Sequence, residues 1–249
     1  MPAFDRLFDD AAFAGFYDLE NGWGADLDYC VALAADARSV LDLGCGTGEL
    51  AIALGEGRRV VGVDPATAML EIARAKPGAD RVRFIEGDAR AIRLGETFDL
   101  VVMTGHAFQV FLNEHDQRAV LATIAAHLAP GGRFVFDTRN PLVREWLEWV
   151  PENSERLIMH PQVGRVKAWN DMLHDPATGI VTYETHYLVE KGGPHLTAAS
   201  KILFTPKPRI EAMLAASGLS VERWAGDWQG GAWHEDAAEI IPIGRFSVS

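Results

Sequence analysis

The 249-residue chain has few cysteines and no long apolar segment. Its two cysteines, Cys30 and Cys45, cannot form a disulfide framework, which favours a reducing compartment, and we expect a cytoplasmic protein. No apolar run approaches the roughly 18 residues that cross a bilayer. Residues 1–15 are interrupted by charges and do not resemble a signal peptide. The sequence therefore predicts neither a membrane span nor a secretory signal.

Positive charge is scarce as well. The 23 Lys and Arg residues face 35 Asp and Glu residues, giving a net charge of −12, and the basic residues are scattered along the chain. Because nucleic-acid-binding proteins usually present a basic face to the phosphates, this balance argues against a nucleic-acid partner. The eight histidines show no metal-ligand spacing, since the pairs His106/His115 and His186/His195 are nine residues apart. We therefore predict no metal.

From residue 39 to residue 137 the sequence alternates between two kinds of segment. Short runs rich in β-branched and aliphatic residues predict strands that are buried on both faces, and longer stretches between them predict helices. This alternation predicts a doubly wound α/β fold with a parallel sheet and right-handed crossovers. The predicted strands are Val40–Leu43, Val60–Val63, Val82–Glu86, Leu100–Met103 and Arg133–Asp137, and the predicted helices are Gly48–Leu54, Ala66–Lys76 and Asp116–Leu128.

The pattern changes after Pro141. Three predicted strands, Gly164–Leu173, Ile180–Glu190 and His195–Thr205, are joined by short turn sequences at residues 175–179 and 191–194, so they must run antiparallel. A helix at Arg209–Ser217 and strands at Leu219–Trp224 and Glu239–Phe246 follow. We therefore predict a main domain of residues 1–141 plus 207–249, with a helical lid at 1–38 that is broken near 21–24. Residues 142–206 form an antiparallel cap inserted after the fifth strand.

The most specific feature is the segment from Val40 to Gly48, where a strand enters a glycine-rich turn and then a helix. Glycines permit positive φ and let a ligand approach the backbone, and the first such turn of an open α/β sheet lies where ligands bind. A dinucleotide loop would need glycine at position 49, where this chain has Glu49, and no Lys-Ser/Thr pair makes a P-loop. Asp42 precedes the glycines and can pair with an ammonium group of a ligand.

These residues resemble motif I of the class I S-adenosylmethionine-dependent methyltransferases, and the resemblance continues in register over about residues 15–140. It implies a Rossmann-like, mostly parallel sheet of seven strands that binds S-adenosylmethionine and releases S-adenosylhomocysteine. By this resemblance Asp64 grips the ribose hydroxyls, Met69 packs on the adenine, Asp88 meets the adenine amino group, and Tyr17 lies near the methionine moiety. The donor-binding residues that we predict are Tyr17, Asp42, Gly44, Cys45, Gly46, Gly48, Asp64, Pro65, Met69, Asp88, Ala89, Thr104 and Gly105.

The segment after the fourth strand, Met103–Phe108, bears on the acceptor. Family members that methylate base nitrogens or protein glutamine carry an Asn/Asp-Pro-Pro-Tyr-type sequence here, and this chain does not. His106 is our candidate general base, because its ordinary pKa suits that task, or else it lines the pocket. The predicted cap and lid offer acceptor-pocket residues, although alternate residues of a strand point to opposite faces. We select Trp23, Arg165, Trp169 and His186; Asn170 and Tyr187 are further candidates.

The leading hypothesis is methyl transfer to an oxygen or nitrogen of a small molecule by a monomer or homodimer. The cap layout resembles that of aminosugar N-methyltransferases. Three alternatives remain open: methylation of RNA or protein, a donor-binding protein without catalysis, and a nicotinamide-dependent oxidoreductase. Glu49, in place of a third loop glycine, argues against the last of these.

Overall fold

The structure, a computed structural model, describes residues 5–190 and 192–246. The first four residues of the predicted lid and Lys191 of a predicted turn lie outside this range. The central sheet has the strand order β11-β12-β5-β4-β1-β2-β3, and a short strand, β6, also pairs with β12. Strands β1 to β5 are parallel, whereas β12 and β11 are antiparallel, which confirms the predicted Rossmann-like sheet of seven strands. The bounds are β1 Ser39–Leu43, β2 Arg59–Asp64, β3 Val82–Glu86, β4 Phe98–Met103, β5 Leu128–Phe136, β6 Thr138–Arg139, β11 Leu219–Ala225 and β12 Glu239–Phe246.

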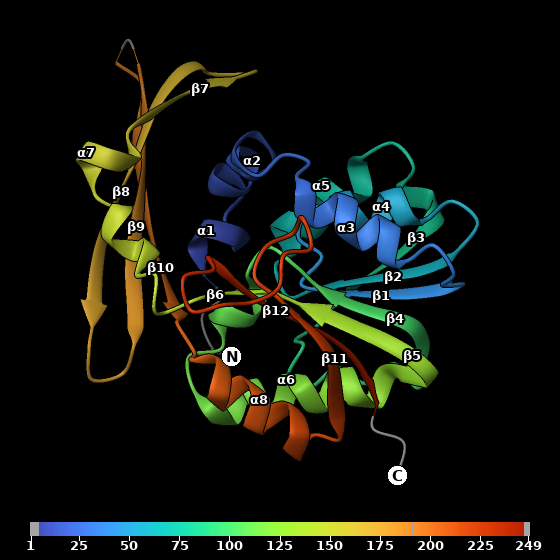
Figure 1. Cartoon of the computed structure of the whole chain (residues 1–249). Helices are drawn as coiled ribbons and strands as arrows, with labels where there is room; N and C mark the ends of the chain where they lie inside the picture. Colours follow the sequence, from blue (N-terminus) through green and yellow to red (C-terminus); the bar gives the residue numbers. More distant parts are fainter. Residues whose placement is uncertain (1–4, 191, 247–249) are drawn as a thin grey trace.

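Helices cover both faces of this sheet (Figure 1). One face packs against α3 and α4 through a buried apolar core, with α5 beside β2 and β3, and the other packs against α6 and α8 through a core that also contains phenylalanines. Capping sets the boundaries: α6 begins at Glu114, two residues before the predicted start, because the Asn113 side chain accepts a hydrogen bond from the Asp116 N–H. The helices are α1 Arg6–Asp9, α2 Ala11–Glu20, α3 Ala25–Leu33, α4 Glu49–Leu54, α5 Thr67–Ala75, α6 Glu114–His127, α7 Pro151–Ser154 and α8 Lys207–Ala216, with 3₁₀ turns η1 Ala79–Arg81, η2 Ala107–Val110 and η3 Glu145–Glu148.

The cap is an antiparallel sheet in the order β10-β9-β8-β7, and it stands beside the carboxyl ends of the parallel strands (Figure 1). Its antiparallel character agrees with the sequence prediction, but it has four strands rather than three. The strand that was missed, β7, is an edge strand with Leu157 and Met159 exposed, so its pattern lacks the polar outer face that marks a half-buried strand. The bounds are β7 Arg156–His160, β8 Gly164–Asp175, β9 Ile180–Val189 and β10 His195–Leu203.

The N-terminal helices connect the two sheets. Phe13 and Phe16 of α2 pack in the core of the cap, where the Phe16 ring stacks on Tyr187 at 4.0 Å. Ala14, on the other side of α2, packs against Met69 of α5. Helix α2 therefore touches both the cap and the wall of the central sheet, as a lid would. None of the helices in the described ranges is long and apolar enough to span a membrane.

Candidate active site

Two adjoining cavities lie at the carboxyl ends of the parallel strands. They lie at the switch point between the neighbouring strands β1 and β4, from which the strand order runs in opposite directions. The loop cavity, about 860 Å³, runs along the glycine turn and the ends of β2 and β3. The cap cavity, about 640 Å³, lies between the sheet edge and the inner face of the cap. Both volumes suit small-molecule ligands. They share a wall made of Phe8, Tyr17, Gly44, Thr104, Gly105 and Val110.

The glycine turn after β1 presents bare backbone to the cavities. Gly44 and Gly46 have φ values of 77° and 51°, a conformation that other residues rarely adopt. A Cβ atom on Gly44 would lie 3.0 Å from the Cβ of Ala107, so glycine also keeps this passage open. The turn is fastened to β2, because the Gly44 N–H donates to the carbonyl of Val63 at 2.7 Å. The sequence prediction of a ligand cradle at these glycines agrees with this geometry.

Two acids flank the turn. The Asp64 carboxylate accepts hydrogen bonds from the Gly46 and Ala66 N–H groups, both at 2.8 Å, and lines the loop cavity. It therefore fixes the turn instead of capping a helix, since α5 begins only at Thr67. Burial raises the pKa of Asp64, although these hydrogen bonds oppose the change.

Asp42 differs from Asp64 in its contacts with the rest of the described chain. It is 2% exposed and lines the cap cavity, and within the described residues no donor is hydrogen-bonded to its carboxylate. Burial, together with the charge of Asp64, raises the pKa of Asp42 to about 7. A buried carboxylate left without a donor at a cavity wall is suited to an ammonium group of a ligand.

Gly48 does not line either cavity, which differs from the prediction that it binds the donor. Its φ is 75°, and a Cβ atom there would lie 2.8 Å from Cζ of Phe84 and 3.0 Å from the Cβ of Ala73. Gly48 faces the packing between β3 and α5 because it forms the start of α4. Its role in this structure is close packing rather than ligand contact.

Asp88 and its neighbours form the far end of the loop cavity. Asp88, Ala89, Pro65 and Met69 all line it, as the sequence prediction requires. The Asp88 carboxylate, however, is already bound by the Arg90 guanidinium at 2.6–3.0 Å, and this contact lowers the pKa of Asp88. Its predicted contact with an adenine amino group would have to be made beside Arg90.

Tyr17 brings the lid to the glycine turn. Its ring lies 3.8 Å from the ideal Cβ position of Gly46, and its hydroxyl lies 3.6 Å from that of Gly105. The next residue, Asp18, accepts a hydrogen bond from the Thr47 hydroxyl and pairs with Lys76 at 2.7 Å. The lid helix is thus attached to the turn and to the end of α5. Cys45, Thr104 and Gly105 complete the predicted donor-side wall of the cap cavity.

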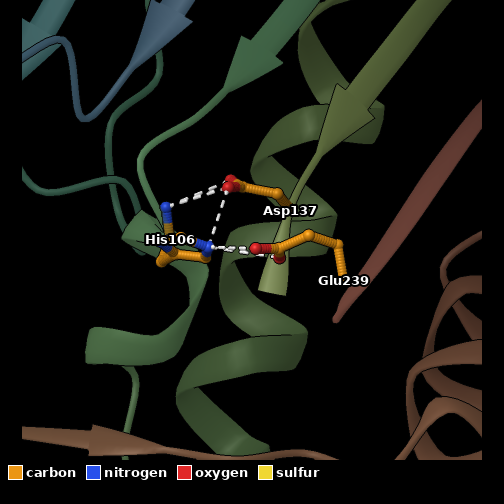
Figure 2. A group of neighbouring side chains, drawn as sticks. All are labelled: His106, Asp137 and Glu239. Atoms are coloured by element: carbon orange, nitrogen blue, oxygen red, sulfur yellow. Dashed lines mark hydrogen bonds and ion pairs between the residues drawn. The ribbon is translucent and has the colours of Figure 1, made fainter. Parts of the chain in front are cut away.

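His106 lies between two carboxylates in the cap cavity (Figure 2). Its Nε2 atom is 2.9 Å from Oε1 of Glu239 and 3.4 Å from Oδ2 of Asp137. Its backbone N–H donates to both Asp137 oxygens, at 3.1 and 3.2 Å. Its φ of 60° is rare for a residue other than glycine and marks a held conformation. We call His106, Asp137 and Glu239 the acidic triad.

The protonation of the acidic triad follows from this packing. Burial disfavours charged His106, but the charges of Asp137 and Glu239 outweigh burial and raise its pKa. Burial raises the pKa of Asp137 to about 6, opposed by the His106 charge. For Glu239 the hydrogen bond to His106 outweighs burial and lowers the pKa. The two acids therefore favour the protonated imidazole, and at neutral pH the triad as a whole carries a net negative charge.

The inner face of the cap carries a polar chain. Arg156 donates to Glu20 of the lid and to Oδ1 of Asn170 at 2.9 Å, and Asn170 donates to the Thr185 hydroxyl at 2.8 Å. The Tyr187 hydroxyl also donates to Glu20. All five residues line the cap cavity. This chain joins the lid to the cap along one side of the cavity.

The four selected acceptor-pocket residues are not among those that line the cavities. Trp169 and His186 stack on one another at 4.8 Å on the outer face of the cap sheet, opposite to Asn170 and Tyr187. Arg165 shares that face and pairs with Glu190. Trp23 is 46% exposed and donates to Asp28. In the pairing of β8 with β9, the odd-numbered residues of β8 lie on the outer face of the cap sheet.

Sequence reasoning also missed Asp137 and Glu239. Asp137 directly follows β5, and an acid at the end of a parallel strand is a signal that could have been used. Glu239 begins β12, which runs antiparallel to β5, so its start lies at the same sheet edge as the end of β5. The position of Glu239 at the site becomes visible only once the pairing of β12 with β5 and β6 is known.

We expect Glu20→Gln to loosen the lid. The variant keeps the side-chain shape but removes the charge that binds Arg156, and a hydrogen bond to a charged group contributes about 1.5–3 kcal/mol. Amide hydrogen exchange in α2 should become roughly tenfold faster, which corresponds to about 1.4 kcal/mol. The matched control is Glu114→Gln, which removes an ion pair with Arg118 on the exposed side of α6. Unchanged exchange in α2 would contradict the role of this contact.

Comparisons with known proteins agree with this geometry. A family model described as a methyltransferase domain matches residues 40–132. The dTDP-3-amino-3,6-dideoxy-alpha-D-glucopyranose N,N-dimethyltransferase of Streptomyces fradiae is 31% identical over 202 residues, which is 76% of this chain and 73% of that protein. The cypemycin N-terminal methyltransferase of a Streptomyces species is 41% identical over 107 residues, 43% of this chain and 44% of that protein. The match thus spans less than half of that relative's length.

Among solved structures, the CcbJ methyltransferase of Streptomyces caelestis superposes with a TM-score of 0.78. It is 21% identical and covers 96% of this chain and 100% of its own, so it shows a shared fold. The fold and the site define an α/β enzyme scaffold with a glycine cradle at the switch point. The chain belongs to the class I S-adenosylmethionine-dependent methyltransferases. This membership speaks against the nicotinamide-dependent alternative.

The residues present fit S-adenosylmethionine. The glycine turn offers the close backbone approach that a nucleoside needs, and Asp64 and Met69 lie along the loop cavity. Asp42, the carboxylate without a donor, lies on the other side of the shared wall, where an amino-acid end would reach. A buried acid that lacks a partner is costly unless a cation binds it, and the donor carries an ammonium group.

Proposed function

We propose that this chain transfers a methyl group from S-adenosylmethionine to a nitrogen or oxygen of a small-molecule acceptor. The observation that carries the proposal is the shared wall between the two cavities. Tyr17, Thr104 and Gly105 separate a nucleoside-sized cavity from a second, capped cavity that holds the acidic triad. A donor seated along the glycine turn would therefore present its reactive end to whatever occupies the cap cavity.

The chain's contribution would be mainly positioning. Asp42 would bind the donor ammonium group, Asp64 the ribose hydroxyls, and Met69 the adenine. The donor's sulfonium supplies a methyl group that is already activated. Holding the reactants in line can contribute about 7–11 kcal/mol to lowering the barrier. The cap and lid would limit the access of water, because Glu20, Arg156 and Tyr187 join them beside the cavity.

The size and charge of the cap cavity support a small acceptor over a macromolecule. Its lining contains six acids, which would repel nucleic-acid phosphates. The polar chain joins the lid to the cap beside this cavity, whose volume of about 640 Å³ suits a small molecule. We further propose a cytoplasmic location, because both cysteines are free thiols. The predicted absence of a metal remains a prediction.

The test has two stages. Calorimetric titration should show binding of S-adenosylmethionine and of S-adenosylhomocysteine, and failure of both to bind at high micromolar concentration would refute the proposal. Radiolabelled methyl transfer should then be measured with a cell extract split into low-molecular-mass and macromolecular fractions. Label in the small-molecule fraction supports the proposal, label confined to the macromolecular fraction indicates a macromolecular acceptor, and binding without label indicates a non-catalytic protein.

A further inference from the structure

The charges of the acidic triad do not balance. One imidazole faces two carboxylates, those of Asp137 and Glu239. Arg139 acts electrostatically on all three members of the triad, but it also pairs with Glu145 at 3.2 Å and donates to Oε1 of Gln109 at 3.1 Å. The triad, Arg139 and Glu145 together therefore carry a net negative charge at neutral pH, beside the wall of the cap cavity.

The rest of the cap cavity does not supply the missing cation. The positively charged residues among its described lining are Arg139, Arg156 and His106. Arg156 is bound by Glu20 and Asn170, on the inner face of the cap. On the acid side, Glu49 shares Lys76 with Asp18, at 2.9 and 2.7 Å, and Asp42 faces the proposed donor. The chamber consequently favours a positively charged acceptor.

We propose that the acceptor is an amine that enters as its ammonium ion, is held by Asp137 and Glu239, and gives its proton to Asp137. This inference rests on the proposed function and names its substrate class. A hydroxyl acceptor would need no such charge, and an anionic acceptor would be repelled by it.

The two carboxylates have different roles because their contacts differ. Glu239 already shares the His106 Nε2 proton, at 2.9 and 3.1 Å from its two oxygens. It is a positioning residue that holds the imidazole. Within residues 5–190 and 192–246, the Asp137 carboxylate accepts the backbone N–H of His106, and its only other polar contact is a longer one of 3.4 Å to Nε2. Asp137 therefore keeps lone pairs for a further proton, and its pKa of about 6 makes it a stronger base than an ordinary aspartate.

The proton balance is closed within the site. The ammonium N–H bond breaks, the proton forms an O–H bond with Asp137, and the nitrogen keeps the electron pair as a neutral amine. That pair forms the new bond to the methyl carbon, and the pair of the broken carbon–sulfur bond stays on sulfur. The methylated ammonium then carries the positive charge that entered on the sulfonium, and Asp137 returns its proton to solvent as the product leaves.

The first experiment uses chemical capping of amines. A low-molecular-mass cell extract is incubated with the protein and methyl-labelled S-adenosylmethionine, before and after treatment with acetic anhydride in water. Capping should lower incorporation by at least tenfold, because an amide is neither cationic nor nucleophilic. An equal mixture of capped and uncapped extract should retain about half of the label, which excludes inhibition by the reagent. Label that persists after capping overturns the amine proposal and leaves the proposed function intact.

The second experiment tests the residues. Asp137→Asn should lower turnover by about 10²-fold and Glu239→Gln by about tenfold, with S-adenosylhomocysteine affinity unchanged within threefold by calorimetry. With S-adenosylmethionine held at saturation at every pH, so that Asp42 does not limit donor binding, the decline of wild-type activity below about pH 6 should disappear in the residual activity of Asp137→Asn. Glu190→Gln, which removes a cap acid outside the cavity, is the control and should behave as wild type. Full activity of Asp137→Asn would overturn the proposal, because Asp137 would then not accept the proton. Loss of activity on adding EDTA would also overturn it, because a metal cation would then occupy the carboxylates.

Discussion

Replacing Asp42 with asparagine should weaken S-adenosylmethionine binding by about 100-fold and, at the same time, stabilise the free protein. The affinity loss, about 2.7 kcal/mol, is that of a charge-assisted contact between a buried carboxylate and an ammonium group. The stability gain follows from burial: Asp42 is almost fully enclosed and lacks a hydrogen-bond donor among the described residues, so its ionised form is unfavourable in the folded state. Asparagine has the same shape without the charge.

The two effects of Asp42 should depend on pH in opposite directions. Its folded-state pKa, about 7, lies above the ordinary value of 3.8, so its contribution to stability is full below about pH 4 and is lost as the pH rises through 7. The thermal advantage of Asp42→Asn should thus be absent near pH 4, grow as the pH rises, and reach its full size above about pH 7. Donor affinity of the wild type should instead increase up to about pH 7, as the carboxylate forms, and then level.

Calorimetric titration and thermal unfolding between pH 4 and pH 8 measure both effects. A gain of 1 kcal/mol would raise the melting temperature by about 2–4 °C in a chain of this size. Asp80→Asn is the matched control, because Asp80 is an exposed acid of η1 on the surface. A variant that binds the donor as tightly as wild type at pH 8 would refute the role of Asp42.

The second large effect is on stability and concerns Gly48. We expect Gly48→Ala to destabilise the fold by about 3 kcal/mol, because it combines left-handed strain of about 1–2 kcal/mol with overpacking of 1–3 kcal/mol. The new methyl group would meet Phe84 at 2.8 Å. Gly57→Ala is the matched control: Gly57 has nearly the same φ, 72°, but a Cβ there meets nothing within 4 Å.

Urea unfolding of the two glycine variants separates strain from packing. The control should lose only the strain, about 1–2 kcal/mol, and the difference between the variants is the cost of the contact with Phe84 and Ala73. Equal losses would mean that β3 and α5 move aside without cost. Loss of donor affinity in a Gly48→Ala protein that remains folded would instead place Gly48 in the binding surface.

The donor side of the site could be predicted from sequence because its signals are local. Asp42, Gly44 and Gly46 occupy one strand and its turn, and Asp64 ends the next strand, so strand–turn–helix patterning was enough to bring them to one edge. Local patterning also misjudged one member. Gly48 belongs to the same motif, yet its neighbours Phe84 and Ala73 come from distant segments, so only the packed structure shows what it contacts.

The acceptor side depended on information that a single sequence does not carry. In β8 and β9 alternate residues face opposite sides, and Asn170 and Tyr187 face the cavity whereas Trp169 and His186 face away. Which set faces inward depends on how the cap sheet packs on α2. Phe16 of α2 stacks on Tyr187, so the face of the sheet that carries Tyr187 is the inner one. Aromatic and histidine content therefore gave no guide to orientation.

The wall shared by the two cavities has a practical consequence for inhibitor design. Since Tyr17, Thr104 and Gly105 border both compartments, one molecule can occupy them together if it joins an adenosine-like part to an amine-bearing part. In such a bivalent ligand the second part binds at the high effective concentration created by the first, so a short tether would multiply two modest affinities. Varying the tether length would measure the separation between the two subsites directly.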